Sequence, residues 1–329
     1  MPLSTIIQNR VPEDWKMFEN LMAQTLKSES EMLEYINKYL LNNAGKKLRP
    51  LLCLLTAKAC SGFINEKTIA CAAVSELIHT ATLLHDDVVD DGDYRRGKLT
   101  VCKLFSKGTS LLVGDYWLTK AIHLMMKYDC PISVIEIYAR ALENLAEGEM
   151  IQMDCANSLK TDYENYKKII SYKTASLFVA SIKSPAIVQN ASQEVVSKMT
   201  EYAEYLGICF QIRDDILDYH PTSETGKNSD VDISERKITL PLLCAFKNCP
   251  AREEYIRGRM SEIDISQKQK NKDIIAEIKQ FVIDNSGVES AIIILKDYIA
   301  KAAGCLSILD ESPSRSDLLS ITQGLGENL

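Results

Sequence analysis

Hydrophobic residues recur three and four positions apart along most of the chain, a spacing that predicts helices. The pattern is clearest in residues 66–91, 114–128 and 200–219. Residues 66–91 are apolar almost all round, so we expect this helix to lie inside a bundle rather than on its surface. We find no convincing alternation of apolar and polar residues that would indicate strands. The pattern therefore predicts an all-α protein.

Short breaks interrupt the helical pattern at residues 42–45, 92–97, 221–234 and 248–250. None has the length or composition of a linker between domains. Glycine and proline number only 14 and 9 among 329 residues, which favours long elements. We find no internal repeat. The expected organisation is one domain over residues 1–329, built as a single large helical bundle around a central cavity.

Charge and cysteine content exclude several classes of protein. With 38 basic and 45 acidic residues the net charge is −7, so we expect no nucleic-acid partner. The ten cysteines form no C-x-x-C pair, which argues against a zinc knuckle or a dithiol redox site and fits a reducing compartment. We see neither a secretory signal nor an apolar run of about 18 residues, so we expect no transmembrane segment and a cytoplasmic location.

Two clusters of aspartates lie within these apolar helices. The first reads His85-Asp86-Asp87-Val88-Val89-Asp90-Asp91, and the second reads Asp214-Asp215-Ile216-Leu217-Asp218. On a helix the first and last aspartate of each D-D-x-x-D pattern are about 40° apart, so they share one face. Such carboxylates repel one another unless cations neutralise them, and oxygen-only ligands suit Mg²⁺. The pair of clusters predicts a magnesium and phosphate site.

Basic residues surround both clusters and could hold diphosphate, because arginine matches phosphate oxygens as a fork and lysine supplies a point charge. Taken singly, each is more readily explained as a solvated surface charge than as a ligand. The set near the clusters is Lys46, Arg49, Arg95, Arg96, Lys173, Lys227 and Lys237.

Four sequence motifs resemble the trans-isoprenyl diphosphate synthase family, and in length the chain is similar to its long-chain polyprenyl members. The motifs are GKKLRP, LLHDDVVDDGDYRRGK, YKTASLF and FQIRDDILDY, within residues 45–241. The resemblance implies the isoprenoid synthase type I fold, usually as a homodimer. It implies Mg²⁺-dependent condensation of isopentenyl diphosphate with an allylic diphosphate such as farnesyl diphosphate. It also implies about three Mg²⁺ ions with substrate bound.

The resemblance also assigns roles to individual residues. Metal ligands would be Asp86, Asp90, Asp214 and Asp218. Isopentenyl diphosphate would contact Lys46, Arg49, His79 and Arg96. The allylic diphosphate side would be formed by Arg95, Lys173, Thr174, Gln211, Lys227 and Lys237. The catalytic set would be Asp86, Asp90, Arg95, Lys173 and Asp214.

The chain departs from the family in the loop after the second cluster. Two positions that commonly hold glycine in relatives are Asp230 and Arg236 here. A loop without these glycines is expected to be stiffer or to close differently. This departure bears on the roles assigned to Lys227 and Lys237.

A small side chain upstream of the first cluster, Ala81, favours a long product. Ala81 precedes Asp86 by about 7.5 Å of helix axis, and Ile78 lies a further turn away. In the family a bulky aromatic near the Ala81 position shortens the product, and the helix has none here. We therefore expect six or more isoprene units, as in a quinone side chain, with Ile122 and Met125 of the facing helix as candidates for the tunnel floor.

Other functions remain open at this stage. A short-chain farnesyl or geranylgeranyl diphosphate synthase would share all these motifs, and Ala81 argues against it. A terpene cyclase would have no need of Lys46, Arg49 and His79. An HD-type metal phosphohydrolase would use His85-Asp86 but leave the second cluster unexplained. A silent subunit would be expected to have eroded clusters, and an EF-hand would need a glutamate that is missing.

Overall fold

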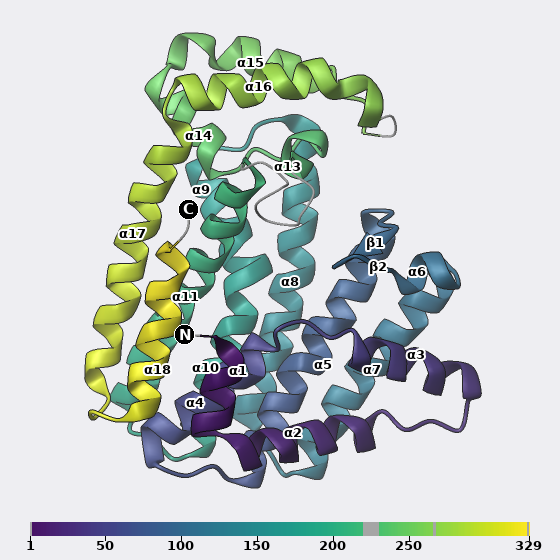
Figure 1. Cartoon of the computed structure of the whole chain (residues 1–329), viewed down its shortest axis with the longest axis vertical. Coiled ribbons are helices and arrows are strands. Elements are labelled where there is room, and N and C mark those ends of the chain that lie inside the picture. The colour runs from purple at the N-terminus through teal and green to yellow at the C-terminus, as the bar shows by residue number, and fades with distance from the viewer. Residues whose placement is uncertain (1, 220–229, 266–267, 328) are drawn as a thin grey trace. The chain divides into compact units, whose positions relative to one another are not determined.

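The structure is a computed structural model that describes residues 2–219, 230–265, 268–327 and 329. The described chain is almost entirely helical, which confirms the all-α fold class (Figure 1). It divides into two compact units. The first contains residues 1–142, 177–200 and 306–321, and the second contains residues 143–176, 201–305 and 322–329. The expectation of a single domain stays a prediction.

Helices of the first unit surround the long helix α5. Its complete elements are α1 (Leu3–Arg10), α2 (Pro12–Thr25), α3 (Glu31–Asn42), α4 (Leu48–Ser61), α5 (Glu66–Val89), α6 (Val101–Leu104), α7 (Lys107–Lys127), β1 (Tyr94–Arg95), β2 (Lys98–Leu99) and η4 (Leu306–Ile308). Helices that contribute residues to both units are α8 (Ile132–Ser158), α10 (Ser176–Val188), α11 (Gln193–Asp218) and α18 (Pro313–Gln323).

Helix α5 begins where the sequence supplies a cap. The Asn65 side chain accepts a hydrogen bond from the Thr68 N–H at 2.9 Å, which satisfies one of the donors that a helix start leaves open. The following residues are buried on every side, as the apolar pattern predicts. Helix α7 packs along α5, as Figure 1 shows, and α2 and α4 pack against it as well. Helix α5 is therefore the core element of this unit.

The second unit has its own apolar core. Its complete elements are α9 (Tyr163–Ile170), the π-helix η1 (Ser171–Ala175), α13 (Val231–Ser234), α14 (Leu240–Asn248), η2 (Pro250–Arg252), α15 (Glu253–Ser261), η3 (Lys268–Asn271), α16 (Lys272–Asp284), α17 (Gly287–Cys305) and η5 (Gly324–Gly326). Buried side chains of α14, α15 and α16 pack together, among them Leu242, Ile256, Ile278 and Phe281.

The structure corrects the predicted elements at several points. Helix α7 begins at Lys107, earlier than predicted, since Ser106 caps it by accepting from the Thr109 N–H at 3.0 Å. The break over residues 92–97 contains the short strand β1, although no strand was predicted. The break over residues 221–234 lies partly outside the described residues, and its end forms the helical turn α13. Among the described helices, none combines the length and hydropathy that a membrane crossing requires.

Candidate active site

The first aspartate cluster occupies the last turn of α5. Helix α5 ends at Val89, and the Asp90 N–H donates to the Asp86 carbonyl at 2.8 Å, so Asp90 caps the helix. Asp86 is partly buried and Asp90 is exposed. Carboxylates at a helix C-terminus face the negative end of the helix dipole, which is unfavourable in the absence of cations. The placement suits a cation-binding site at the C-terminal end of this buried helix.

Cations already compensate the other aspartates of this cluster. Asp87 is 6% exposed, and its carboxylate accepts a hydrogen bond from Arg95 Nε at 2.8 Å. Burial raises the pKa of Asp87, and the Arg95 charge opposes this rise. Asp91 has a positive φ of 50° and pairs with Lys107 at 2.9 Å. The ion pair with Asp87 fixes Arg95, the residue assigned to the allylic diphosphate, beside the predicted metal ligands.

A second basic group of the first unit gathers around Glu76 and His79. Burial raises the pKa of Glu76, and the charges of Arg49, Lys47 and Arg96 oppose this rise. Burial lowers the pKa of His79 well below its ordinary value, and the arginines lower it further, so His79 is neutral near pH 7. The structure thus brings together three of the four residues that the resemblance assigns to isopentenyl diphosphate, namely Arg49, His79 and Arg96.

Close packing holds these arginines. The Arg49 guanidinium lies 4.6 Å from the centre of the Phe178 ring. A Cβ on Gly45 would lie 2.2 Å from Arg96 Nη1, so any larger residue at this position would require the guanidinium to move. Arg96 itself has a positive φ of 52°. Lys46, the fourth predicted residue, is exposed in the turn before α4 and makes no contact that places it in this group.

The second aspartate cluster lies at the C-terminal end of α11. Asp215 is 2% exposed, and Tyr166 donates to its Oδ2 at 2.6 Å while Gln211 donates to its Oδ1 at 2.9 Å. Burial raises the pKa of Asp215 to about 7. Thr174 donates to the Gln211 carbonyl oxygen at 2.6 Å, which fixes the orientation of that amide. Asp215 therefore serves the packing of the site, and Asp214 is partly buried beside it.

Lys173 and Thr174 lie in the π-helix η1, a wider turn inserted between α9 and α10. Turns of this kind are common at functional sites because they redirect side chains from a regular helix. Lys173 donates to Gln152 Oε1 at 2.7 Å and pairs with Glu149. Sequence reasoning identified Lys173 but missed the acidic and amide partners on α8.

Two glycines let neighbouring helices approach η1. A Cβ on Gly148 of α8 would lie 2.9 Å from the backbone nitrogen of Lys173. A Cβ on Gly207 of α11 would lie 2.5 Å from the Ala175 Cα. Neither distance is sterically tolerable, so both helices need glycine at these positions. Only the structure reveals this, because an isolated glycine within a helical sequence has no distinct pattern.

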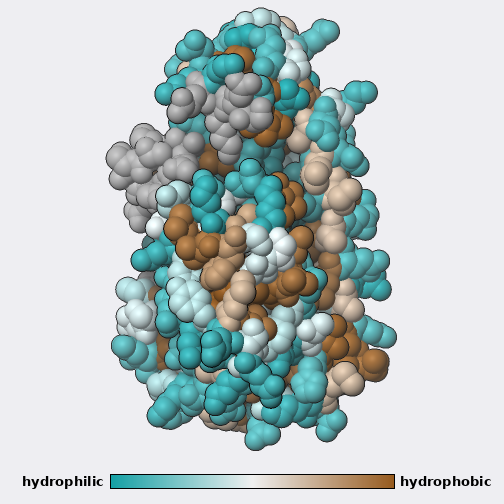
Figure 2. Space-filling view, turned by 90° about the vertical axis from the view of Figure 1, so that its right-hand side faces the viewer, coloured by the Kyte–Doolittle hydropathy of each residue, from teal (hydrophilic) through white to brown (hydrophobic). Residues whose placement is uncertain are grey.

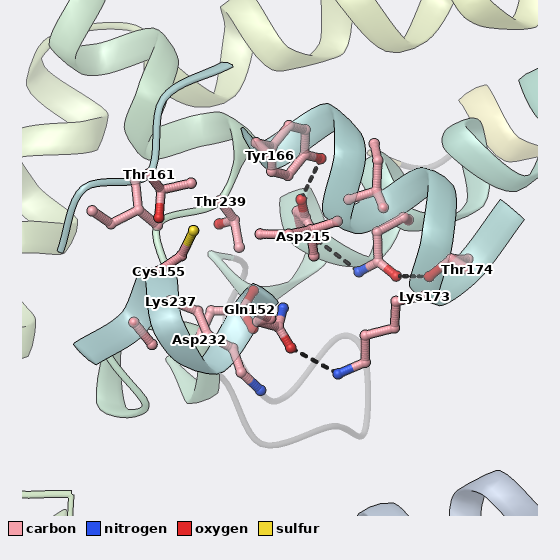
Figure 3. A pocket seen from close by; sticks show the side chains of 15 residues that line it. Gln152, Cys155, Thr161, Tyr166, Lys173, Thr174, Asp215, Asp232, Lys237 and Thr239 are labelled. Atoms are coloured by element: carbon pink, nitrogen blue, oxygen red, sulfur yellow. Dashed lines mark hydrogen bonds between the residues drawn. The ribbon is translucent and has the colours of Figure 1, made fainter. Parts of the chain in front are cut away.

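A pocket of about 110 Å³ lies in the second unit between η1 and the residues after α13. Figure 3 shows Lys173, Asp215, Asp232 and Lys237 around it, and one of the dashed lines marks the hydrogen bond that Lys173 donates to Gln152. Lys237 pairs with Glu235 at 2.6 Å. The lining of the pocket is thus rich in charged and hydrogen-bonding groups. Four of them are residues that the resemblance assigns to the allylic side: Lys173, Thr174, Gln211 and Lys237.

Asp218 is held by the backbone at the start of α13. Its Oδ1 accepts from the Val231 N–H and its Oδ2 accepts from the Asp232 N–H, each at 3.1 Å. The residue before α13, Asp230, has a φ of 66°, and Arg236 just after it has a φ of 59°. The two positions where the family resemblance leads us to expect glycine thus both adopt the left-handed conformation that glycine tolerates best. Lys227 lies outside the described residues.

The candidates for chain length differ in burial. Ala81 and Ile78 on α5 are completely buried, and Met125 on α7 is 3% exposed. Ile122 is 48% exposed and shares a face of α7 with Met126, which is 66% exposed. Met125 therefore points into the core and Ile122 lies on the exposed side of α7, so Met125 is the candidate for the tunnel floor that this chain buries, and the assignment of Ile122 stays a prediction.

Comparison with known proteins agrees with this arrangement. The sequence model of the family described as Polyprenyl synthetase matches residues 30–278. An octaprenyl diphosphate synthase from Haemophilus influenzae is 35% identical over 311 residues, covering 94% of this chain and 92% of that protein. A decaprenyl diphosphate synthase structure from Rhodobacter capsulatus superposes with a TM-score of 0.90 at 32% identity, covering 99% of both chains.

A polyprenyl synthase structure from Caulobacter crescentus, in complex with calcium and isoprenyl diphosphate, superposes with a TM-score of 0.89 at 30% identity. It covers 99% of this chain and 97% of that chain. Family model, relatives and structures all confirm the resemblance that the four motifs indicate. The chain therefore belongs to the polyprenyl synthetase family of prenyltransferases.

Proposed function

We propose that this protein is a trans-polyprenyl diphosphate synthase that extends an allylic diphosphate with isopentenyl diphosphate units to a long all-trans product. The observation that carries the proposal is the last turn of α5, where Asp86 and Asp90 lie beside an arginine fixed by Asp87. The octaprenyl and decaprenyl synthases among its relatives support a long product.

The residues present fit a hard divalent cation such as Mg²⁺. Within residues 2–219, 230–265, 268–327 and 329, no three histidine, cysteine or carboxylate side chains converge on one point as a complete protein ligand set. Mg²⁺ characteristically uses one or two carboxylates and completes its shell with water and substrate phosphate. Asp86 and Asp90 would hold it in the first unit, and Asp214 in the second. Bound there, Mg²⁺ would neutralise the charge of the diphosphate oxygens.

Asp218 has a different part in this proposal. Both of its carboxylate oxygens accept backbone hydrogen bonds from α13, so its orientation is already determined by the chain. Asp214 is the better candidate for direct ligation in the second cluster. Asp218 would then hold the start of α13 in place, with any contact to metal secondary.

The reaction follows from the charges that these residues provide. The allylic C–O bond breaks, and its electron pair stays on the diphosphate, whose growing charge would be stabilised by the cations that the family resemblance assigns to the allylic side. The double bond of isopentenyl diphosphate, held by Arg49 and Arg96, supplies its electrons to the allylic carbon and forms the new C–C bond. The proton then lost passes to an oxygen of the released diphosphate. His79 is neutral and serves as a hydrogen-bonding group rather than a charge.

The buried face of α5 would accept the growing chain. Ala81 and Ile78 have no exposed surface, and both are aliphatic, so no aromatic ring blocks this face of the helix at their positions. Successive isoprene units would extend along α5 away from Asp86, toward Met125 of α7. A short-chain farnesyl or geranylgeranyl diphosphate synthase is the alternative, and a bulky residue at the Ala81 position would favour it.

We also propose that the protein acts as a cytoplasmic homodimer, with the two units functioning together as one domain. The exposed face of α7 supports the dimer, because Leu112 and Met126 are 71% and 66% exposed. Figure 2 faces the side on which Figure 1 shows α7, and hydrophobic side chains lie among hydrophilic ones there. An apolar surface of this kind is typical of an interface between subunits. The second copy of this chain is the partner that we propose for it.

The experiment that tests the function is product analysis. The purified protein is incubated with farnesyl diphosphate, isopentenyl diphosphate and Mg²⁺, and the dephosphorylated products are separated by chromatography. We expect all-trans products of six or more isoprene units. Asp86→Ala should abolish turnover and keep the far-ultraviolet circular dichroism unchanged. A cyclic hydrocarbon, simple hydrolysis, or normal turnover by Asp86→Ala would contradict the assignment.

A further inference from the structure

The segment that follows the second aspartate cluster is bounded by two residues in a strained conformation. Asp230 and Arg236 have φ of 66° and 59°, and the turn α13 lies between them. Side chains with a Cβ pay a steric penalty in this region, and glycine does not. The chain nevertheless has charged residues with a Cβ at both positions, the short aspartate at 230 and the long arginine at 236. A strained residue that persists is usually held by its surroundings.

The side chain of Asp230 binds helix α16. Its Oδ1 lies 2.7 Å from Lys279 Nζ, and both side chains are partly shielded, with 30% and 22% exposure. Helix α13 also packs directly against α16 (Figure 1). Glycine at position 230 would relieve the strain but remove this ion pair. Aspartate at position 230 therefore keeps a strained backbone conformation but attaches the segment to α16, whereas glycine would do the reverse.

Arg236 makes the equivalent attachment to the end of α15. Its Nε donates to the Ile263 carbonyl at 3.0 Å, and its Nη2 donates to the Ser261 carbonyl at 2.9 Å. Carbonyls at a helix C-terminus lack partners within the helix, and a cation there also matches the helix dipole. Arg236 thus completes the end of α15, and in doing so it fixes the far end of the α13 turn.

The attached segment holds groups of the candidate active site. The Val231 and Asp232 N–H groups bind the two oxygens of Asp218, and the Asp230 N–H donates to the Asp218 carbonyl at 3.1 Å. At the other end, Lys237 donates its backbone N–H to the Asp232 carbonyl at 2.8 Å and lines the pocket. Movement of the segment would therefore displace both Asp218 and Lys237.

We infer that Asp230, Lys279 and Arg236 are positioning residues, which tether the α13 segment to α15 and α16 and so set the orientation of Asp218 and Lys237. None of the three touches substrate in this role. The inference rests on the proposed function for its kinetic consequence, since Asp218 and Lys237 affect the rate only if diphosphate and metal bind beside them. The tether itself is a property of the protein without ligands.

The test compares four variants of the full-length protein: Asp230→Gly, Lys279→Ala, the double variant of these two, and Arg236→Gly. Hydrogen exchange of residues 230–239 is measured by mass spectrometry in the metal-free protein. We expect faster exchange in each single variant. The double variant should exchange no faster than Asp230→Gly, because both changes remove one contact. Asp230→Asn, which tolerates positive φ and keeps an acceptor for Lys279, should restore most of the protection.

The second readout is kinetic. For each variant the KM for farnesyl diphosphate and the Mg²⁺ concentration for half-maximal rate should rise by about tenfold or more, since loss of a partner that orients a site residue typically costs about 10- to 100-fold. The matched control is Asp297→Asn, which breaks an exposed ion pair with Lys301 at 2.6 Å within α17 and should change neither value. Its exchange over residues 230–239 should also equal that of the wild type.

The outcomes separate the two proposals. Unchanged exchange in Asp230→Gly and Arg236→Gly would show that no tether exists. Faster exchange with unchanged KM and Mg²⁺ requirement would overturn the positioning role and leave only a contribution to stability. If the wild-type protein forms no elongated prenyl diphosphate, the proposed function fails. The exchange data then decide the tether by themselves, and the positioning role falls with the function.

Discussion

Replacing Gly207 by alanine should impair catalysis by moving the π-helix η1. The new Cβ would lie 2.5 Å from the Ala175 Cα and 2.7 Å from its Cβ, whereas ordinary contacts begin at 3.4 Å. Relief of the closer contact needs a displacement of about 0.9 Å, as in other overpacked interiors. Both contacts belong to a residue of η1 itself, so no flexible side chain can move aside. The shift passes along the turn to Lys173 and Thr174.

The two energetic consequences differ in size. Overpacking costs about 1–3 kcal/mol, and alanine recovers about 1 kcal/mol because it favours helix over glycine. The net loss of unfolding free energy should therefore be no more than about 2 kcal/mol. A misplacement near 1 Å at a reacting centre costs about 100-fold in rate. We expect a folded protein whose kcat/KM for the allylic diphosphate is reduced by about 100-fold.

The assay is steady-state elongation with farnesyl diphosphate, accompanied by thermal unfolding. Gly258→Ala on α15 is the matched control, since a Cβ there meets nothing within 4 Å. It should stabilise the protein by up to about 1 kcal/mol and leave kcat/KM unchanged. Wild-type kcat/KM in a folded Gly207→Ala protein would refute the argument that the position of η1 sets the placement of Lys173.

Three further predictions concern product length, pH and assembly. Ala81→Phe should shorten the main product, because Ala81 is completely buried on the proposed path of the chain; the same chain length by chromatography would contradict that path. His79 has a lowered pKa when folded, so only the unfolded chain gains its proton as pH falls through the ordinary value of 6.5. The unfolding free energy should therefore decrease below that pH by up to about 1.4 kcal/mol per pH unit, and urea titrations should show a smaller decrease for His79→Gln. Leu112→Glu combined with Met126→Glu should halve the mass seen by light scattering, and an unchanged dimer mass would place the interface elsewhere.

The sequence predicted the parts of the site that depend on residue type and local period. Asp86 and Asp90 were expected at the C-terminal end of a buried helix, and α5 ends there. The burial of Ala81 and Ile78 follows from the same apolar pattern. These features are local, since helix periodicity alone determines which residues share a face. The family resemblance then supplied the roles that periodicity could not.

Features that depend on distant parts of the chain were not predicted. The π-helix at Lys173 lies against Gly148 and Gly207 on two other helices, where a side chain would clash with it. The backbone cap on Asp218 comes from α13, which follows it only after the loop. The exposure of Ile122 was not predicted either, because hydrophobicity does not tell an inward from an outward position on a helix with a broad apolar surface. Tertiary packing determines the position of the π-helix, the contacts of Asp218 and the side on which Ile122 lies. No local pattern in a single sequence shows this packing.

The left-handed conformation of Asp230 and Arg236, on either side of α13, also has a genetic consequence. In the standard code an aspartate or arginine codon becomes a glycine codon by a change of one base. Asp230 and Arg236 both have a positive φ, so a point mutation to glycine at either site would relieve the backbone strain and remove the side chain that anchors the segment. The stiffness of this segment is therefore a trait that a single base change can adjust without replacing any residue of the second cluster.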